Sequence, residues 1–175
     1  MKASSILNPL RKFLFANKTA DGFLSKLTSK YPGSLLFIKL LPGNNLYDQP
    51  ALRHCKKWGI NFELDISDYQ NWLIYFNSSA DSSFGVLKFL QEGNIVFDIG
   101  GNIGQTALRM AEIVGDKGKV YTFEPYPSNF NKLKTNLLLN PQLQNITAEN
   151  VALGESKAEL ESMLIVLQIQ ALTGF

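Results

Sequence analysis

The 175-residue sequence contains few of the residues that build metal clusters and disulfide frameworks. It has one cysteine, Cys55, and one histidine, His54. A single cysteine cannot form an internal disulfide, and this pair is too small for a metal cluster, so we expect no bound metal and a reducing, cytoplasmic setting. Because neighbouring residues point in different directions on a strand or a helix, the two side chains are also poorly placed for shared chemistry.

Long apolar runs are missing as well. No stretch approaches the roughly 20 apolar residues that a membrane-spanning helix requires. The first residues contain no continuous apolar region before a small-residue cleavage site, so we expect neither a membrane span nor a secretory signal. Apolar residues make up 45% of the chain, which is typical of a folded domain of moderate size.

Acidic residues are scarce in the first third of the chain. Residues 1–60 hold ten Lys and Arg against Asp21 and Asp48, whereas residues 61–175 hold seven against thirteen acids. A basic surface of this kind could meet a polyanion or an anionic membrane. The basic residues are dispersed and are not clustered with aromatic ones, so we interpret them as a solvated face and expect no nucleic-acid partner.

Residues 1–58 form a leading region whose elements the sequence leaves unresolved. Two Pro-Gly pairs bracket the apolar run SLLFIKLL at 34–41, which is too short to decide between strand and helix. The strand-forming runs at 60–66 and 71–76 predict a β-hairpin within residues 59–84. The segment 83–93 predicts a helix with Val86, Leu87 and Leu90 on one face, ending at Gly93.

From residue 94 onward the pattern alternates between strands and helices. The runs IVFDI (95–99), KVYTFEP (119–125) and NITAENVAL (145–153) predict three strands, the first of them buried on both faces of a parallel sheet. Two amphipathic helices separate them, the second capped by Ser128. Residues 85–157 therefore predict one half of a doubly wound α/β domain with right-handed crossovers. The residues expected to face inward are Ile103, Ala107, Met110, Ala111 and Val114 in the first helix, and Phe130, Leu133, Leu137 and Leu138 in the second.

A glycine-rich turn, Gly100 to Gly104, follows the first of these strands. Without side chains, the backbone of such a turn can lie directly against a ligand at the carboxyl edge of the sheet. The dinucleotide pattern requires glycine where this chain has Asn102 and Gln105, so a classical NAD site is disfavoured. A tight connection that binds nothing is the simpler alternative.

Two acids accompany this turn. Glu124 ends the second predicted strand, where a carboxylate can accept hydrogen bonds from both hydroxyls of a ribose. Asp98 ends the first strand, just below the turn. One acid for a ribose and another near the turn suit a ligand with a nucleoside and a positively charged group, such as S-adenosylmethionine.

Four segments together, VFDIGGNIG, FEPYP, LKTNLLLN and NVALGE, resemble the FkbM-type family of S-adenosylmethionine-dependent methyltransferases, which have a Rossmann-like fold. The resemblance covers about residues 60–157. An asparagine in the middle of the turn is its most discriminating feature, because most methyltransferases have glycine there. The residues that match the family pattern are Asp98, Gly100, Asn102, Gly104, Glu124, Pro125, Asn150, Ala152 and Leu153.

The resemblance implies a role for each part of the site. Asp98 and the backbone of Gly100, Gly101, Asn102 and Gly104 would hold the methionine moiety, and Glu124 would hold the ribose. Pro125 and Tyr126 would flank the adenine, with Ala152 nearby. The implied reaction is methyl transfer to a hydroxyl oxygen of a sugar, glycan or secondary metabolite, and catalysis would depend on near-attack geometry and a base. The motifs identify no catalytic residue.

The chain departs from the family after the third strand. Family members continue with four more strands and a Lys-x-Asp-x-Glu-Gly-like segment, whereas residues 158–175 form an atypical tail without it. We therefore expect a truncated methyltransferase, with a free edge on 95–99 and apolar surface uncovered on both faces of the sheet. Such an edge favours self-association. The alternative is a non-catalytic remnant that binds a nucleoside or a partner.

Overall fold

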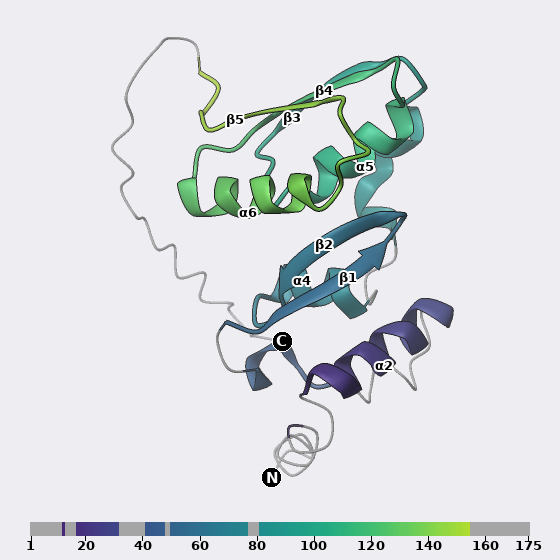
Figure 1. The fold of residues 1–175 in the computed structure, drawn as a ribbon, viewed down its shortest axis with the longest axis vertical. Coiled ribbons are helices and arrows are strands. Elements are labelled where there is room, and N and C mark those ends of the chain that lie inside the picture. Colours follow the sequence, from purple (N-terminus) through teal and green to yellow (C-terminus); the bar gives the residue numbers. More distant parts are fainter. Residues whose placement is uncertain (1–11, 13–16, 32–40, 48–49, 77–80, 155–175) are drawn as a thin grey trace, which may run out of the picture.

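The computed structural model describes residue 12 and residues 17–31, 41–47, 50–76 and 81–154 (Figure 1). The predicted tail at 158–175 and most of the apolar run at 34–41 lie outside these residues. No helix in the described part of the chain has the length and apolar character needed to cross a membrane.

A parallel three-stranded sheet organises the second half of the chain. Its strands are β3 (Ile95–Ile99), β4 (Lys119–Phe123) and β5 (Ile146–Glu149), in the order β3-β4-β5. Helix α5 (Gln105–Val114) connects β3 to β4, and helix α6 (Pro127–Leu138) connects β4 to β5. Figure 1 shows both helices on the same side of this sheet. The predicted α/β class and parallel sheet are confirmed, while the doubly wound part stays a prediction.

One face of the sheet is covered and the other is open. Val120 and Thr122 of β4 are fully buried on the helical side. The predicted inward residues Ala107, Met110, Ala111 and Val114 of α5 are buried as well, whereas Ile103 is buried in the turn before the helix and not in the helix itself. On the other side, Ile95, Phe97 and Ile99 of β3 are 60–70% exposed. The prediction that β3 is buried on both faces was therefore wrong, and so was the prediction that both faces lack cover. Within the described residues β3 does lie at the edge of the sheet, as predicted.

The hairpin forms with a different partner strand from the predicted one. Strands β1 (Leu52–Lys57) and β2 (Ile60–Asp65) pair antiparallel across the turn residues Trp58 and Gly59, whose φ angles are 52° and 79°. Two residues with positive φ are typical of the tight turns that match the twist of paired strands. The hairpin crosses the predicted boundary at residue 58, so the leading region is continuous with it.

The predicted strand at 71–76 is a helix. Helix α4 spans Tyr69–Phe76, and the side chain of Asp68 accepts a hydrogen bond of 3.0 Å from the backbone N–H of Asn71. This cap satisfies a free donor of the first helical turn. Trp72 and Phe76, one turn apart, are both buried. Capping and burial of one helical face therefore outweigh the strand preference of the aromatic residues.

Two further helices differ from prediction in the face that they bury. Residues Asp81–Phe89 form a 3₁₀ helix, η2, in which residues three apart share a side. Leu87 is buried there, but Val86 is 53% exposed. In α6, Leu138 is 81% exposed, because it lies five residues beyond the buried Leu133 and points to another side. The N-cap position of α6 is Tyr126, so Ser128 lies inside the first turn.

The third predicted strand is shorter than expected. Strand β5 ends at Glu149, opposite Phe123 at the end of β4, so a longer strand would have no partner there. Beyond it, the side chain of Asn150 donates hydrogen bonds to the carbonyls of Glu124 and Pro125 at 2.7 and 3.1 Å. The chain therefore stays beside the end of β4 after the strand has stopped.

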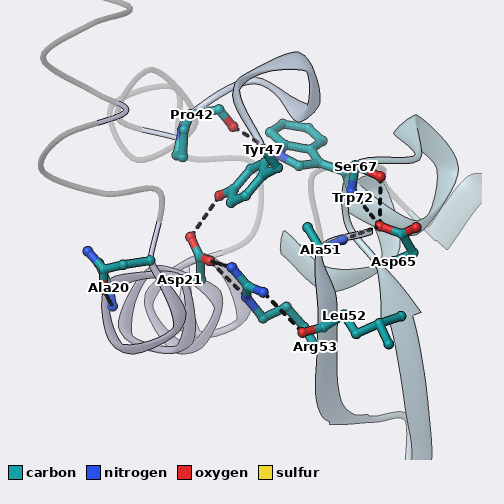
Figure 2. A network of polar contacts seen from close by, with 11 residues as sticks. Ala20, Asp21, Pro42, Tyr47, Ala51, Leu52, Arg53, Asp65, Ser67 and Trp72 are labelled. Carbon is teal, nitrogen blue, oxygen red and sulfur yellow. Dashed lines mark hydrogen bonds and ion pairs between the residues drawn. The ribbon is translucent and has the colours of Figure 1, made fainter. Parts of the chain in front are cut away.

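The first half of the chain packs as a second unit of helix and hairpin. Helix α2 spans Lys18–Lys30, and the short 3₁₀ helix η1 spans Asn44–Leu46. Asp21 of α2 is fully buried and accepts hydrogen bonds from Tyr47 at 2.7 Å and from Nε and Nη2 of Arg53 at 2.9 and 2.6 Å (Figure 2). Breaking one partner of such a buried charge pair is costly, so this network fixes α2 against β1. Figure 1 shows α6 between the parallel sheet and the hairpin.

Candidate functional site

The turn between β3 and α5 is held in an unusual backbone conformation. Gly100, Asn102 and Gly104 have φ angles of 87°, 49° and 87°, and asparagine is one of the few residues besides glycine that tolerate this region. The N–H groups of Gly100 and Gly101 both donate to the carbonyl of Phe123 at 2.9 and 3.0 Å. The turn is thereby fixed against the carboxyl end of β4.

Gly100 and Gly101 have different roles in this turn. A β-carbon at Gly101 would collide with Oγ1 of Thr122 and lie 3.0 Å from Cδ1 of Leu133, so glycine is needed there for packing inside the protein. A β-carbon at Gly100 would meet no protein atom within 4 Å. The backbone at Gly100 is therefore open, and it is the part of the turn that a ligand can approach.

Glu124 connects the end of β4 to the glycine turn. Its side chain is 6% exposed, with Oε2 accepting from the N–H of Asn102 at 2.8 Å and Oε1 accepting from the N–H of Tyr126 at 2.9 Å. A carboxylate offers about four lone-pair sites, so each oxygen keeps one for a further donor. The predicted proximity of Glu124 to the turn is thus present, and the carboxylate retains the capacity to accept two hydroxyls.

Asp98 lies beneath the same turn and is 8% exposed. Burial raises the pKa of this carboxyl above its usual value, and the negative charge of Glu124 raises it further, while a hydrogen bond from Oγ1 of Thr122 at 3.0 Å lowers it. None of these three influences is cationic. A buried acid that is destabilised in this way would be relieved by a positively charged ligand.

Thr122 was not identified from the sequence. It is fully buried and lies opposite Asp98 in the register of β3 and β4. Its side chain contacts Asp98 and occupies the space where a β-carbon at Gly101 would lie. Thr122 lies two residues before Glu124, so the two side chains point to the same side of the chain. This spacing is the sequence signal that could have identified Thr122 as part of the site.

The predicted adenine-flanking residues lie on the segments that leave β4 and β5. Pro125 and Tyr126 are exposed, and Tyr126 is the residue immediately before α6. Ala152 is exposed in the segment after β5. Asn150 ties that segment to Glu124 and Pro125, so the ends of the two strands are held together.

His54 and Cys55 belong to the hairpin, away from this turn. Nε2 of His54 lies 3.1 Å from Oε2 of Glu63, and burial raises the pKa of Cys55 to about 11, which keeps the thiol protonated. An open pocket of about 400 Å³ is lined by His54, Cys55, Lys56, Asn61, Phe62 and Leu139. Among the described residues, no group of His, Cys, Asp and Glu side chains is arranged to hold a metal ion.

Residues 98–168 match the family model of the methyltransferase FkbM domain. The matched segment, 71 of the 175 residues, is thus similar to part of an FkbM-type methyltransferase domain. The match begins at Asp98 and contains the glycine turn, Glu124 and Tyr126. The hairpin and the leading helices lie before the matched residues.

A curated relative is similar to part of this chain. The fibrillarin-like rRNA/tRNA 2′-O-methyltransferase of Pyrobaculum neutrophilum is 29% identical over 101 residues. The aligned region covers 57% of this chain and 39% of the relative. The chain thus spans about two fifths of the length of the curated relative that it matches. Because this relative is named for RNA, the expectation of no nucleic-acid partner has no support.

Several solved structures share part of the fold. TYW2 of P. horikoshii with MeSAdo is 22% identical with a TM-score of 0.46, covering 61% of this chain and 38% of that chain. TYW2 of M. jannaschii with AdoMet is 24% identical with a TM-score of 0.44, covering 58% and 44%. A SAM-dependent methyltransferase from Aquifex aeolicus is 28% identical with a TM-score of 0.36, covering 46% and 42%. Scores at this level describe a shared piece of fold and carry no argument about function.

Proposed function

We propose that the glycine turn binds S-adenosylmethionine and that the FkbM-type domain transfers its methyl group to a hydroxyl oxygen. The observation that carries this proposal is the arrangement of Glu124. Its buried carboxylate is fixed by two backbone N–H groups and still has lone pairs to offer at the carboxyl edge of the sheet. The match of residues 98–168 to the family supports methyl transfer and leaves the acceptor open.

The residues present fit this cofactor. Glu124 has one free acceptor site on each oxygen for the two ribose hydroxyls. The open backbone at Gly100 admits the methionine moiety, because no protein atom occupies the space where a side chain would lie. Asp98 supplies negative charge close to that position, and it gains from a neighbouring cation because its own surroundings hold none that shifts its pKa.

We assign the adenine to the segments that leave β4 and β5. Tyr126 is 43% exposed and offers an aromatic surface at the start of α6, beside Pro125. Ala152 is a small exposed residue on the neighbouring segment, which Asn150 holds against Pro125. We further propose that residues 85–157 form the cofactor-binding half of the domain.

The acceptor is a hydroxyl in both forms of this proposal. In the form that the sequence resemblance implies, it belongs to a sugar, a glycan or a secondary metabolite. In the form that the name of the curated relative suggests, it is the 2′-hydroxyl of an RNA ribose. S-adenosylmethionine supplies a methyl group on a positively charged sulfur, and the protein's task is to hold donor and acceptor in line. The second class of function is a non-catalytic protein that binds the nucleoside without turnover.

The experiment combines calorimetry with a transfer assay. The full chain is titrated with S-adenosylmethionine, and methyl transfer from labelled cofactor is then measured with a set of oligosaccharides and with bulk RNA. Stoichiometric binding with transfer to either pool supports the enzyme and selects the acceptor class. Binding without transfer to any hydroxyl supports the non-catalytic alternative, and absence of binding overturns the proposal.

We also propose that the open side of the sheet mediates self-association. Phe97 stacks with Tyr121 and Phe123 at centroid distances of 5.4 and 6.2 Å, forming an aromatic surface on the face that the helices leave open. The edge of β3 has no strand partner within the described residues. Unpaired edges and apolar patches together favour pairing with another copy.

A further inference from the structure

Two asparagines, Asn136 in α6 and Asn140 just after its end, are buried although their side chains are polar. Asn136 is fully buried and Asn140 is 1% exposed, and they lie one helical turn apart. A buried amide is costly unless its donors and acceptor are hydrogen-bonded. Their partners therefore indicate what these two residues do.

Asn140 pairs with the free edge of the hairpin. Its Oδ1 accepts from the N–H of Asn61 at 2.8 Å, and its Nδ2 donates to the carbonyl of the same residue at 2.7 Å. This is the pair of bonds that a neighbouring strand would make with β2. Asn140 also donates to the carbonyl of Asn136 at 2.7 Å, and its Oδ1 accepts from Nε2 of Gln142 at 3.4 Å, so none of these bonds reaches the glycine turn.

Asn136 makes one bond to the hairpin and one to the glycine turn. Its Oδ1 accepts from the N–H of Glu63 on β2 at 2.8 Å. Its Nδ2 donates to the carbonyl of Ile103 at 2.9 Å. Ile103 lies between Asn102 and Gly104, so one amide group joins the hairpin edge to the centre of the turn.

The turn depends on such outside support. It has left-handed backbone at Gly100, Asn102 and Gly104, and a non-glycine residue in that region persists only when its surroundings fix it. Glu124 holds the N–H of Asn102 on one side. Asn136 holds the carbonyl of Ile103, the residue after Asn102, on the other side. The side chain of Ile103 also belongs to the same core as Phe62 and Leu64 of the hairpin.

We propose that Asn136 is a positioning residue, which presets the glycine turn for the cofactor by fixing it to the hairpin. The proposal rests on the proposed binding of S-adenosylmethionine at this turn. It also assigns a function to the leading hairpin, which lies before the residues that match the family. The hairpin supports the glycine turn through Asn136. A turn already held in its binding conformation has less entropy to lose when the ligand binds.

Asn140 provides a matched control. Asn136→Ala and Asn140→Ala each remove a buried asparagine that is bonded to β2, but only the first breaks the bond to the turn. Both full-length variants are tested for folding by circular dichroism. Their affinity for S-adenosylmethionine is then measured by calorimetry, and hydrogen exchange is measured over residues 100–106.

The positioning role predicts a specific difference between the variants. Asn136→Ala weakens the affinity about five-fold, which corresponds to one lost hydrogen bond, and speeds exchange in the turn by a similar factor. Asn140→Ala leaves both within two-fold of the parent chain. Equal effects of the two variants on affinity and exchange would show that Asn136 is merely structural and would overturn the proposal.

A second variant, Asn136→Leu, serves if the alanine variant does not fold, because leucine has the same branching as asparagine and leaves no cavity. It lacks the donor to Ile103 without burying a charge, so exchange in the turn is expected to rise about five-fold. Unchanged exchange would contradict the inference. The exchange measurement needs no ligand. If the parent chain does not bind S-adenosylmethionine, the proposed function fails, and the exchange data still decide whether Asn136 orders the turn.

Discussion

Substitution of Glu124 by glutamine tests how the site holds a ribose. The change keeps the size of the side chain but replaces one carboxylate oxygen with an NH₂ group, which cannot accept a hydrogen bond. In the protein, one oxygen accepts from Asn102 and the other from Tyr126, so one of these N–H groups must lose its partner. The lone pair that would accept one ribose hydroxyl is lost with it.

The expected magnitudes follow from these bonds. A buried donor left without a partner costs about 1–3 kcal/mol, so the free energy of unfolding should fall by about 2 kcal/mol. A hydrogen bond to a charged group contributes about 1.5–3 kcal/mol, and each 1.4 kcal/mol changes a dissociation constant ten-fold. The affinity for S-adenosylmethionine should therefore fall by about 10- to 100-fold.

The assay is isothermal calorimetry with S-adenosylmethionine, combined with urea unfolding of the ligand-free chain. Glu149→Gln is the control, because it removes the same charge from an exposed residue at the end of the neighbouring strand. Unchanged affinity in Glu124→Gln would refute the assignment of Glu124 to the ribose. An equal loss in Glu149→Gln would show that only the overall charge matters.

Three further changes probe the packing, the charge and the open face of the sheet. Gly101→Ala should lower the free energy of unfolding by about 1–3 kcal/mol in urea titrations, because the added carbon collides with Thr122, and unchanged stability would contradict that packing. Asp98→Asn should weaken S-adenosylmethionine binding at least about ten-fold, as expected when a charged partner is lost. It should also make the ligand-free chain more stable at pH 7. Because burial raises the pKa of Asp98 in the folded state, that gain should shrink as the pH falls towards 3.8, and a gain that grows would contradict the direction of the shift. Phe97→Lys should reduce self-association in sedimentation velocity, since this residue is 60% exposed on the open face, and a monomeric parent chain would remove the basis for that proposal.

The parallel half of the fold could be predicted because its signals are local. The apolar run of β3, the inward stripe of α5 and the glycine that ends this helix each specify their element without distant contacts. The run at 71–76 misled because a short aromatic segment has no decisive period. Its helical state depends on the Asp68 cap and on burial of one side of the helix.

The acids and the turn could also be predicted together, because strand ends meet at one edge of a parallel sheet. The contacts of Thr122 and Asn136 could not be predicted in this way. The contact of Thr122 with Asp98 depends on strand register, and the bonds of Asn136 reach residues 33 and 73 positions away in the chain. Polar residues at inward positions of otherwise apolar patterns are the sequence signal for such contacts.

The most direct test of the central claim is the thermal midpoint of the full chain with and without S-adenosylmethionine. A ligand that binds only the folded state stabilises it by about 2.7 kcal/mol at a concentration of 100 times its dissociation constant. We predict a midpoint that rises with cofactor concentration in the parent chain and rises less in Glu124→Gln. A midpoint that does not move at millimolar S-adenosylmethionine would contradict a cofactor site at the glycine turn.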